Sequence, residues 1–451
     1  MASITVGSAR VKSELSNRLP RAAILGICRE AGHGFRTRIL DPVLTLHLLV
    51  WQVLSFNVAL SAVRHLDESS KKVKASAFCQ ARARLPLMVM QKMLRHLCDA
   101  AGATGLFHGR RVWLADGTSA QAPDSKALQE TYPQPSTQAA GCGFPLVKLL
   151  GLFDAATGLL TEMIPSSLHT HEQSMAWQLH PRMKAGDIVV ADRGFCSFWN
   201  VAMPWKQRIL CVFRIHQKQI VSFKPHRRAK RKGEKGKPTS RYVKRLGKHD
   251  QIVEWQKPKT RPHWMTHEQF DAMPNTLQVR ELRYNLTRQG HRTTCVTIAC
   301  TLLDPVEYPR QEVVMLYGTR WEIETHFREL KTTMRMRTLK CQSVDGVQKE
   351  LLAYALAYNL VRLRMRQAAQ LQGVDIQRVS FLDTLRQLLA IAWTDDEQTA
   401  SGDVLLNRLR PDRYEPRVIK RRAKQYDLMN RPRHELRELH RRVPRKELSL
   451  I

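Results

Sequence analysis

The sequence lacks the cysteine patterns that organise disulfide scaffolds and zinc sites. Its nine cysteines include no Cys-x-x-Cys pair and no Cys/His spacing typical of zinc, and their number is odd. An odd count argues against a disulfide framework, so we expect a reducing cytoplasm. The N-terminus has no charged segment followed by an apolar one, and we predict no signal peptide.

The chain has few long apolar runs, and the longest, residues 43–60, is interrupted by His47, Gln52 and Asn57. These polar side chains are costly in a lipid bilayer. Asp41 and Pro42 precede the run as an N-cap and a first-turn proline. We therefore predict a buried helix of a soluble protein and no membrane partner.

Acidic residues are also scarce, with 40 Asp and Glu against 73 Lys and Arg and a net charge of +33. A protein with that excess repels itself unless a polyanion is nearby, so nucleic acid is the first candidate partner and an anionic membrane surface the weaker one. The hydrophobic content of 43% in 451 residues is that of a globular protein with several domains.

Two acidic residues stand at the predicted ends of buried strands in the central part of the chain. The strand that begins at Arg111 ends at Asp116, and the strand that begins at Asp187 ends at Asp192. Strands and helices alternate here, which indicates a mixed α/β sheet, a class in which ligands bind at the carboxyl ends of strands. Each aspartate precedes a glycine closely, so each is also a candidate turn former.

Three basic segments, around 71–84, 224–248 and the C-terminal end, either contact DNA phosphates or are solvated surface.

We predict five regions along the chain. The regions are a helical N-terminal DNA-binding region (1–105), the first part of an α/β core (106–216), a basic loop with a β-rich insertion (217–312), the completion of the core with C-terminal helices (313–400) and a basic tail (401–451).

Residues 313–331 have two faces when read as a helix. The apolar face is a stripe suited to a core, formed by Ile323, Phe327, Leu330 and Met334. The polar face places one carboxylate among cations within about 60° of one another, and comprises Tyr317, Arg320, Glu324 and Lys331, with Arg328 beside them. An acid in a basic cleft suits a site that holds a metal against a phosphate, whereas the alternative is a surface helix of mixed charge.

Glu322 competes with Glu324 for the role of the functional acid in this segment. It lies about 160° away around the helix and forms a Thr319-x-x-Glu322 pattern, which is typical of a capping box. We therefore assign Glu322 to the helix start, which would place Tyr317 before the helix.

The chain resembles the DDE transposases of bacterial insertion sequences, specifically the IS-four group. The signature of that group, Tyr-x2-Arg-x3-Glu-x6-Lys, is matched by Tyr317, Arg320, Glu324 and Lys331. Its two aspartate blocks are matched by Asp116-Gly-Thr and by Ala191-Asp192-Arg-Gly-Phe195. The resemblance covers roughly residues 75–365.

This resemblance implies an RNase H-like catalytic core with a β-rich insertion, flanked by helical N- and C-terminal regions. It implies that Asp116, Asp192 and Glu324 are catalytic and bind two Mg²⁺ ions, for which Mn²⁺ is a substitute. The DNA-binding residues would be Tyr317, Arg320, Lys331 and Arg328. The expected partners are inverted-repeat ends, target DNA and a second copy of the chain in the DNA complex, and we expect the protein in the cytoplasm, associated with the nucleoid. Two alternatives are a related nuclease that cuts without strand transfer and a catalytically silent DNA-binding protein.

Overall fold

The computed structural model describes most of the chain, namely residues 11–36, 39–63, 73–102, 105, 107–139, 141–229, 237–286, 294–389 and 404–407. Three predicted basic parts lie wholly or partly outside the described residues. They are the pair Lys71 and Lys72, residues 230–236 of the basic loop, and nearly all of the basic tail. Contacts divide the chain into two compact units, 1–282 with 298–407, and 283–297 with 408–451. In the second unit, Arg283 Nε donates a hydrogen bond of 3.1 Å to Thr297 Oγ1.

The N-terminal part is helical, as predicted. After a helical stretch over 11–18 come α2 (Arg21–Glu30), α3 (Pro42–Leu54), α4 (Leu60–Val63), α5 (Ala75–Arg84) and α6 (Leu87–Ala100). The Asp41 side chain caps α3 by accepting a hydrogen bond of 2.8 Å from the Leu44 amide. Residues of α3 are buried along almost its whole length, which confirms the predicted buried helix. Among the described residues, no helix is both long and apolar enough to span a membrane.

The described strands form one nine-stranded sheet in the order β3-β2-β1-β4-β5-β9-β8-β7-β6. Their bounds are β1 (Val112–Gln121), β2 (Leu146–Asp154), β3 (Leu160–Ser166), β4 (Ile188–Ala191), β5 (Leu210–Arg214), β6 (Arg241–Gly247), β7 (Asp250–Gln256), β8 (Thr276–Leu286) and β9 (Thr294–Cys300). A mixed α/β architecture is therefore confirmed.

The sheet has two parts with different strand directions. β1, β2 and β3 are antiparallel neighbours, whereas β4 runs parallel to β1 and β5 runs parallel to β4. β5 then pairs antiparallel with β9 through Val212 and Cys300, and β7 pairs antiparallel with β8 and β6. The β-rich insertion thus continues the central sheet through β9 rather than forming a sheet of its own.

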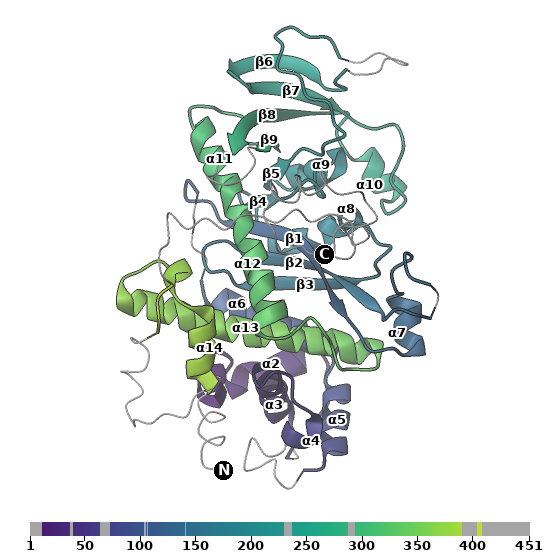
Figure 1. The fold of residues 1–451 in the computed structure, drawn as a ribbon, viewed down its shortest axis with the longest axis vertical. Helices are drawn as coiled ribbons and strands as arrows, with labels where there is room; N and C mark the ends of the chain where they lie inside the picture. The colour runs from purple at the N-terminus through teal and green to yellow at the C-terminus, as the bar shows by residue number, and fades with distance from the viewer. Residues whose placement is uncertain are drawn as a thin grey trace, which may run out of the picture. The chain divides into compact units, whose positions relative to one another are not determined.

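The remaining elements surround this sheet: α7 (Lys126–Thr131), α8 (Glu172–Met175), the 3₁₀ helix η2 (Ala176–Arg182), α9 (Phe198–Lys206), α10 (His267–Asp271), α13 (Val344–Gln372), η5 (Ile376–Arg378) and α14 (Phe381–Leu389). Residues 172–182 are helical throughout and divide into α8 and the 3₁₀ helix η2. The long helix α13 is buried along much of its length, and it packs on α3, α6 and β3 (Figure 1).

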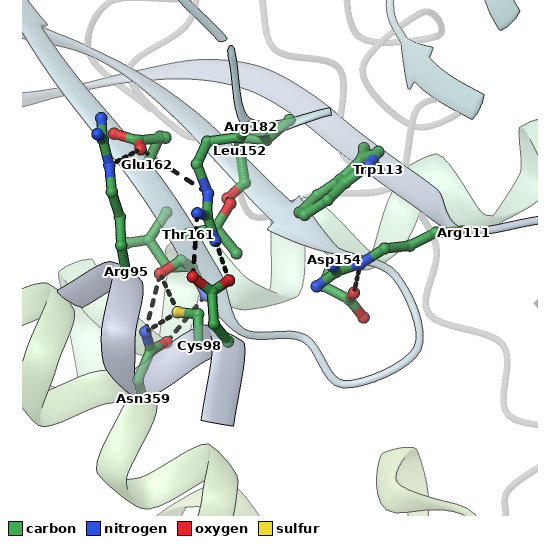
Figure 2. A network of polar contacts seen from close by, with 12 residues as sticks. Arg95, Cys98, Arg111, Trp113, Leu152, Asp154, Thr161, Glu162, Arg182 and Asn359 are labelled. Atoms are coloured by element: carbon green, nitrogen blue, oxygen red, sulfur yellow. Dashed lines mark hydrogen bonds and ion pairs between the residues drawn. The ribbon is translucent and has the colours of Figure 1, made fainter. Parts of the chain in front are cut away.

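Polar contacts join the N-terminal helices to the sheet where α6, β3 and α13 meet (Figure 2). Arg95 of α6 donates a hydrogen bond of 2.6 Å to Glu162 of β3. Asn359 of α13 accepts from the Leu160 amide at 2.9 Å and donates to the Leu160 carbonyl at 2.8 Å. Because these groups are buried or half-buried, the paired hydrogen bonds offset the cost of removing them from water.

The segment with the signature residues is one nearly continuous helical run that changes its winding. It comprises α11 (Arg310–Gly318), the 3₁₀ turn η3 (Thr319–Trp321), α12 (Glu322–Arg328) and the π turn η4 (Glu329–Thr333). Figure 1 shows α11 and α12 following one another along the sheet, where they contact β4 and β1.

The predicted capping box is wrong. The Thr319 hydroxyl donates to the Leu316 carbonyl at 2.7 Å instead of accepting at a helix start, and Tyr317 lies inside α11.

Candidate active site

Asp116 lies in the interior of β1, and the prediction that its strand ends there is wrong. β1 continues to Gln121 because β2 pairs with it along its length, with Asp116 opposite Gly151. One carboxylate oxygen, Oδ1, accepts a hydrogen bond of 2.8 Å from the Gly117 amide. Burial raises the pKa of Asp116 to about 6, against the opposing effects of the Gly117 amide and Arg320. Any additional positive charge beside Asp116 therefore stabilises the ionised form of its carboxyl group.

Asp192 follows β4 directly, as predicted, and so lies at the carboxyl end of a strand parallel to β1. The hydroxyl of Tyr317 donates a hydrogen bond of 3.2 Å to Asp192 Oδ1. Tyr317 itself is buried, with 3% of its surface exposed. The hydrogen bond connects the signature helix to the second aspartate block.

Arg320 is the cation that connects the acids. Its Nη1 lies 3.9 Å from Asp116 Oδ2, and its Nη2 lies 3.3 Å from Glu324 Oε1. The side chain is only 5% exposed. Burial lowers the pKa of Arg320, but the surrounding groups, which include Tyr317, Asp192, Asp116 and Glu324, outweigh burial and raise it. The guanidinium therefore stays charged and attracts acids that come from three separate segments.

Glu324 points away from the core on α12, with about half of its side chain exposed (52%). The predicted apolar stripe of the same helical run, which continues through η4, is buried and anchors it against the sheet. Its members are Ile323, Phe327, Leu330 and Met334. An exposed carboxylate on a firmly packed helix is available to a ligand at fixed orientation.

The other two predicted DNA-binding residues differ in their surroundings. Lys331 Nζ donates a hydrogen bond of 3.0 Å to the Thr118 hydroxyl on β1. Burial, and then the neighbouring Arg337, lowers the pKa of Lys331. Arg328 is exposed on α12, and the described part of the chain offers its side chain no hydrogen bond or ion pair. The structure thus brings Lys331 towards the strand of Asp116 and leaves Arg328 on the surface.

Glu172, the first residue of α8, is a fourth acid at the site that the sequence reasoning missed. A Cβ atom on Gly117 would lie 2.4 Å from Glu172 Oε1, and one on Gly194 would lie 3.1 Å from Glu172 Oε2. Lys148 Nζ lies 3.4 Å from Glu172 Oε1. The glycines of both aspartate blocks therefore leave room for one carboxylate. The sequence feature that could have indicated a further group at the site is the glycine that follows each aspartate, Gly117 after Asp116 and Gly194 after Asp192.

The donor set is suited to Mg²⁺, which prefers carboxylate oxygens. Within the described residues, however, no three Asp, Glu, His or Cys side chains are close enough together to form a metal site. The positive charge between the acids is supplied instead by Arg320, whose Nε has no hydrogen-bond partner among the described residues. The carboxylates are therefore the right kind of ligand for divalent ions. In this structure, however, they are arranged around the Arg320 guanidinium, which neutralises their charge.

Comparisons with known proteins identify the family of the chain. Residues 107–360 match the family model described as a transposase DDE domain. Transposase InsG for insertion sequence element IS4 of Escherichia coli (strain K12) is 25% identical over 415 residues, which are 85% of this chain and 87% of the relative. The cryo-EM structure of the piggyBac transposase synaptic complex with hairpin DNA aligns with 88% of this chain and 83% of its own, at 10% identity and a TM-score of 0.41. Because the family model spans more than half of the 451 residues, the chain belongs to the DDE transposases, and its predicted place among the insertion-sequence enzymes of the IS-four group is confirmed.

Proposed function

We propose that Asp116, Asp192 and Glu324 hold two Mg²⁺ ions, replaceable by Mn²⁺, and that the site cuts DNA at the inverted-repeat ends of its element and joins those ends to target DNA. When bound, the ions activate the attacking hydroxyl and stabilise the leaving oxygen at phosphorus. The observation that carries the proposal is the position of the Arg320 guanidinium, within 3.9 Å of both Asp116 and Glu324.

The protein's own side chains have separate roles in this proposal. Tyr317 orients Asp192 through its hydroxyl hydrogen bond of 3.2 Å. Arg320 holds Asp116 and Glu324 near one another before DNA binds and then contacts a phosphate near the cut. Lys331, placed by Thr118, contacts a second phosphate, and the exposed Arg328 adds positive charge.

The strand arrangement supports an RNase H-like core. Three antiparallel strands, β1 to β3, are followed by β4 and β5, each parallel to its neighbour. Asp116 lies on β1, and Asp192 directly follows the adjacent strand β4. The predicted division into five regions is part of the proposal, with 106–216 and 313–400 forming this core.

We assign DNA contact to the N-terminal region as well. A cavity of about 1100 Å³ lies beside α5 and is bordered by three cationic side chains, Arg36, Lys74 and Arg84. Positive charge around an open cavity suits a DNA backbone. Two copies of the chain would act together on paired ends, which mass photometry with and without DNA measures directly.

The decisive experiment compares cleavage of DNA that carries the element's own inverted repeats in Mg²⁺. Asp192→Ala is expected to abolish cleavage, whereas the exposed Asp271→Asn, which removes an acid on α10, should cut like the wild type. Retained Mg²⁺-dependent cutting by Asp192→Ala would overturn the assignment. Products in which ends are joined to target DNA separate a transposase from a nuclease, and the absence of any metal-dependent cut by the wild type would leave a DNA-binding protein.

A further inference from the structure

A basic pocket borders Lys331, and none of the described residues that line it is acidic. It encloses about 410 Å³. Lys331, Arg335, Arg337 and Lys340 supply four positive charges, and Phe56 and Asn57 enter from the loop after α3. A volume of this size lies within the range of small-ligand sites, which is about 300–1,000 Å³.

The charge in this pocket is not neutralised within the described part of the chain. No carboxylate there forms an ion pair with the side chain of Lys331, Arg335, Arg337 or Lys340. The Arg335 guanidinium lies 4.6 Å above the Phe56 ring, which is 40% exposed. Like charges held together, with no ion pair to their side chains among the described residues, favour an anionic ligand with several charges.

The backbone around the pocket is held in an unusual conformation. Phe56, Asn57 and Arg335 all have left-handed φ values, of 61°, 55° and 63°. Strained residues of this kind persist where the surrounding contacts fix them, and they gather at ligand-binding sites.

A buried carboxylate supplies such a contact to Asn57. Glu350 accepts hydrogen bonds from Asn57 Nδ2 at 2.6 Å and from the Lys340 and Cys341 amides at 3.0 and 2.9 Å. Lys340 Nζ in turn donates to the Asn57 carbonyl. The pocket wall is therefore a built structure that joins the loop after α3 to the segment after η4.

The pocket is connected to the catalytic strand by backbone and side-chain hydrogen bonds. The Gln121 amide, at the end of β1, donates to the Arg337 carbonyl at 2.8 Å. Lys331 donates to Thr118, which lies two positions after Asp116 on β1. A DNA strand with one phosphate at Lys331 would place neighbouring phosphates towards Arg335 and Arg337. We propose that this pocket binds consecutive phosphates of the DNA backbone beside the cut. Arg335, Arg337 and Phe56 then contact the DNA in addition to the signature residues. This inference rests on the proposed function of the site.

The test measures binding without catalysis. Fluorescence anisotropy with a short DNA duplex of arbitrary sequence, in EDTA and over a range of KCl concentrations, gives the slope of log affinity against log salt. The double variant Arg335→Asn/Arg337→Gln should reduce that slope by about 2, because each lost phosphate contact removes about 0.9. Asparagine is chosen at position 335 because it tolerates a left-handed backbone.

A control double variant removes the same charge elsewhere. Lys184→Gln/Lys206→Gln changes two exposed lysines, and it should keep the wild-type slope. If the double variant at the pocket fails to fold, the exposed single variant Arg337→Gln keeps the test available with an expected slope change of about 1. An unchanged slope in the pocket variants, or an equal change in the control, would overturn the inference.

The two proposals fail in distinguishable ways. If the wild type cuts DNA in Mg²⁺ and the pocket variants bind with wild-type slopes, the pocket assignment is wrong and the proposed function stands. If the wild type makes no metal-dependent cut while the pocket variants lose their slope, the catalytic proposal is wrong and the phosphate pocket stands.

Discussion

The hydroxyl of Tyr317 donates a hydrogen bond to Asp192, joining residues that are 125 positions apart. Tyr317→Phe removes only that hydroxyl and should slow single-turnover cleavage about 10- to 150-fold, because a hydrogen bond to a charged group contributes about 1.5–3 kcal/mol. Tyr308→Phe is the matched control, since it removes another buried tyrosine hydroxyl, the one that accepts from Arg110 at 3.0 Å. Equal rates for Tyr317→Phe and the wild type would contradict a role in orienting Asp192.

Gly117→Ala should lower activity without a comparable loss of stability. The new methyl group would meet Glu172 Oε1 at 2.4 Å, and the flexible Glu172 side chain can move away, which displaces its carboxylate from the site. Adding Glu172→Ala to Gly117→Ala should cause little further loss, because the two residues act on the same position. Gly26→Ala in α2 is the control, since nothing lies within 4 Å of its Cβ position. Strictly additive losses in cleavage rate would argue against the coupling.

His180 should make folding less favourable in acid. Burial lowers its pKa from 6.5 to about 4, so the folded state binds this proton more weakly than the unfolded state does. The stability associated with the neutral ring is complete above pH 6.5 and is lost as the pH falls towards 4, which amounts to about 2 kcal/mol between pH 7 and pH 5. Urea unfolding at both pH values, for the wild type and for His180→Gln, measures this difference. A variant with the full wild-type pH dependence would contradict the assignment.

Breaking the buried ion pair of the insertion should be costly. Arg280 Nη2 lies 2.6 Å from Asp250 Oδ2, and the Arg280 side chain is completely buried. Arg280→Ala leaves Asp250 charged and unpaired, with an expected loss of about 3–5 kcal/mol in the free energy of unfolding. Arg241→Ala breaks the more exposed pair with Glu254 and should change stability much less. Chemical denaturation of both variants compares the two pairs.

The sequence predicted the parts of the site that depend on local pattern. The short apolar run of β4 ends where Asp192 begins, so a strand with an acid at its end was readable from neighbouring residues. The apolar stripe of α12 was readable for the same reason, because Ile323 and Phe327 recur at the helical period.

Features that depend on distant partners were not readable. Nothing near Asp116 in the sequence indicates that β2 pairs with β1 as far as Gln121, and that pairing decides where the strand ends. Glu172 is 56 positions from Asp116 and reaches it only through the fold. The capping-box prediction failed because the continuous helical run left Thr319 no free amide groups to cap and gave its hydroxyl the Leu316 carbonyl instead.

The π turn after α12 makes the position of Lys331 relative to Glu324 sensitive to the number of residues between them. In Glu329–Thr333 the Met334 amide bonds to the Glu329 carbonyl, five residues back, so this turn contains one residue more than an α turn. Deleting one residue before Lys331 would restore ordinary winding and swing the lysine about 100° around the axis, away from Thr118, while Glu324 stayed in place. A frame-preserving deletion at this single turn is therefore expected to disable the enzyme even though every signature side chain is still present.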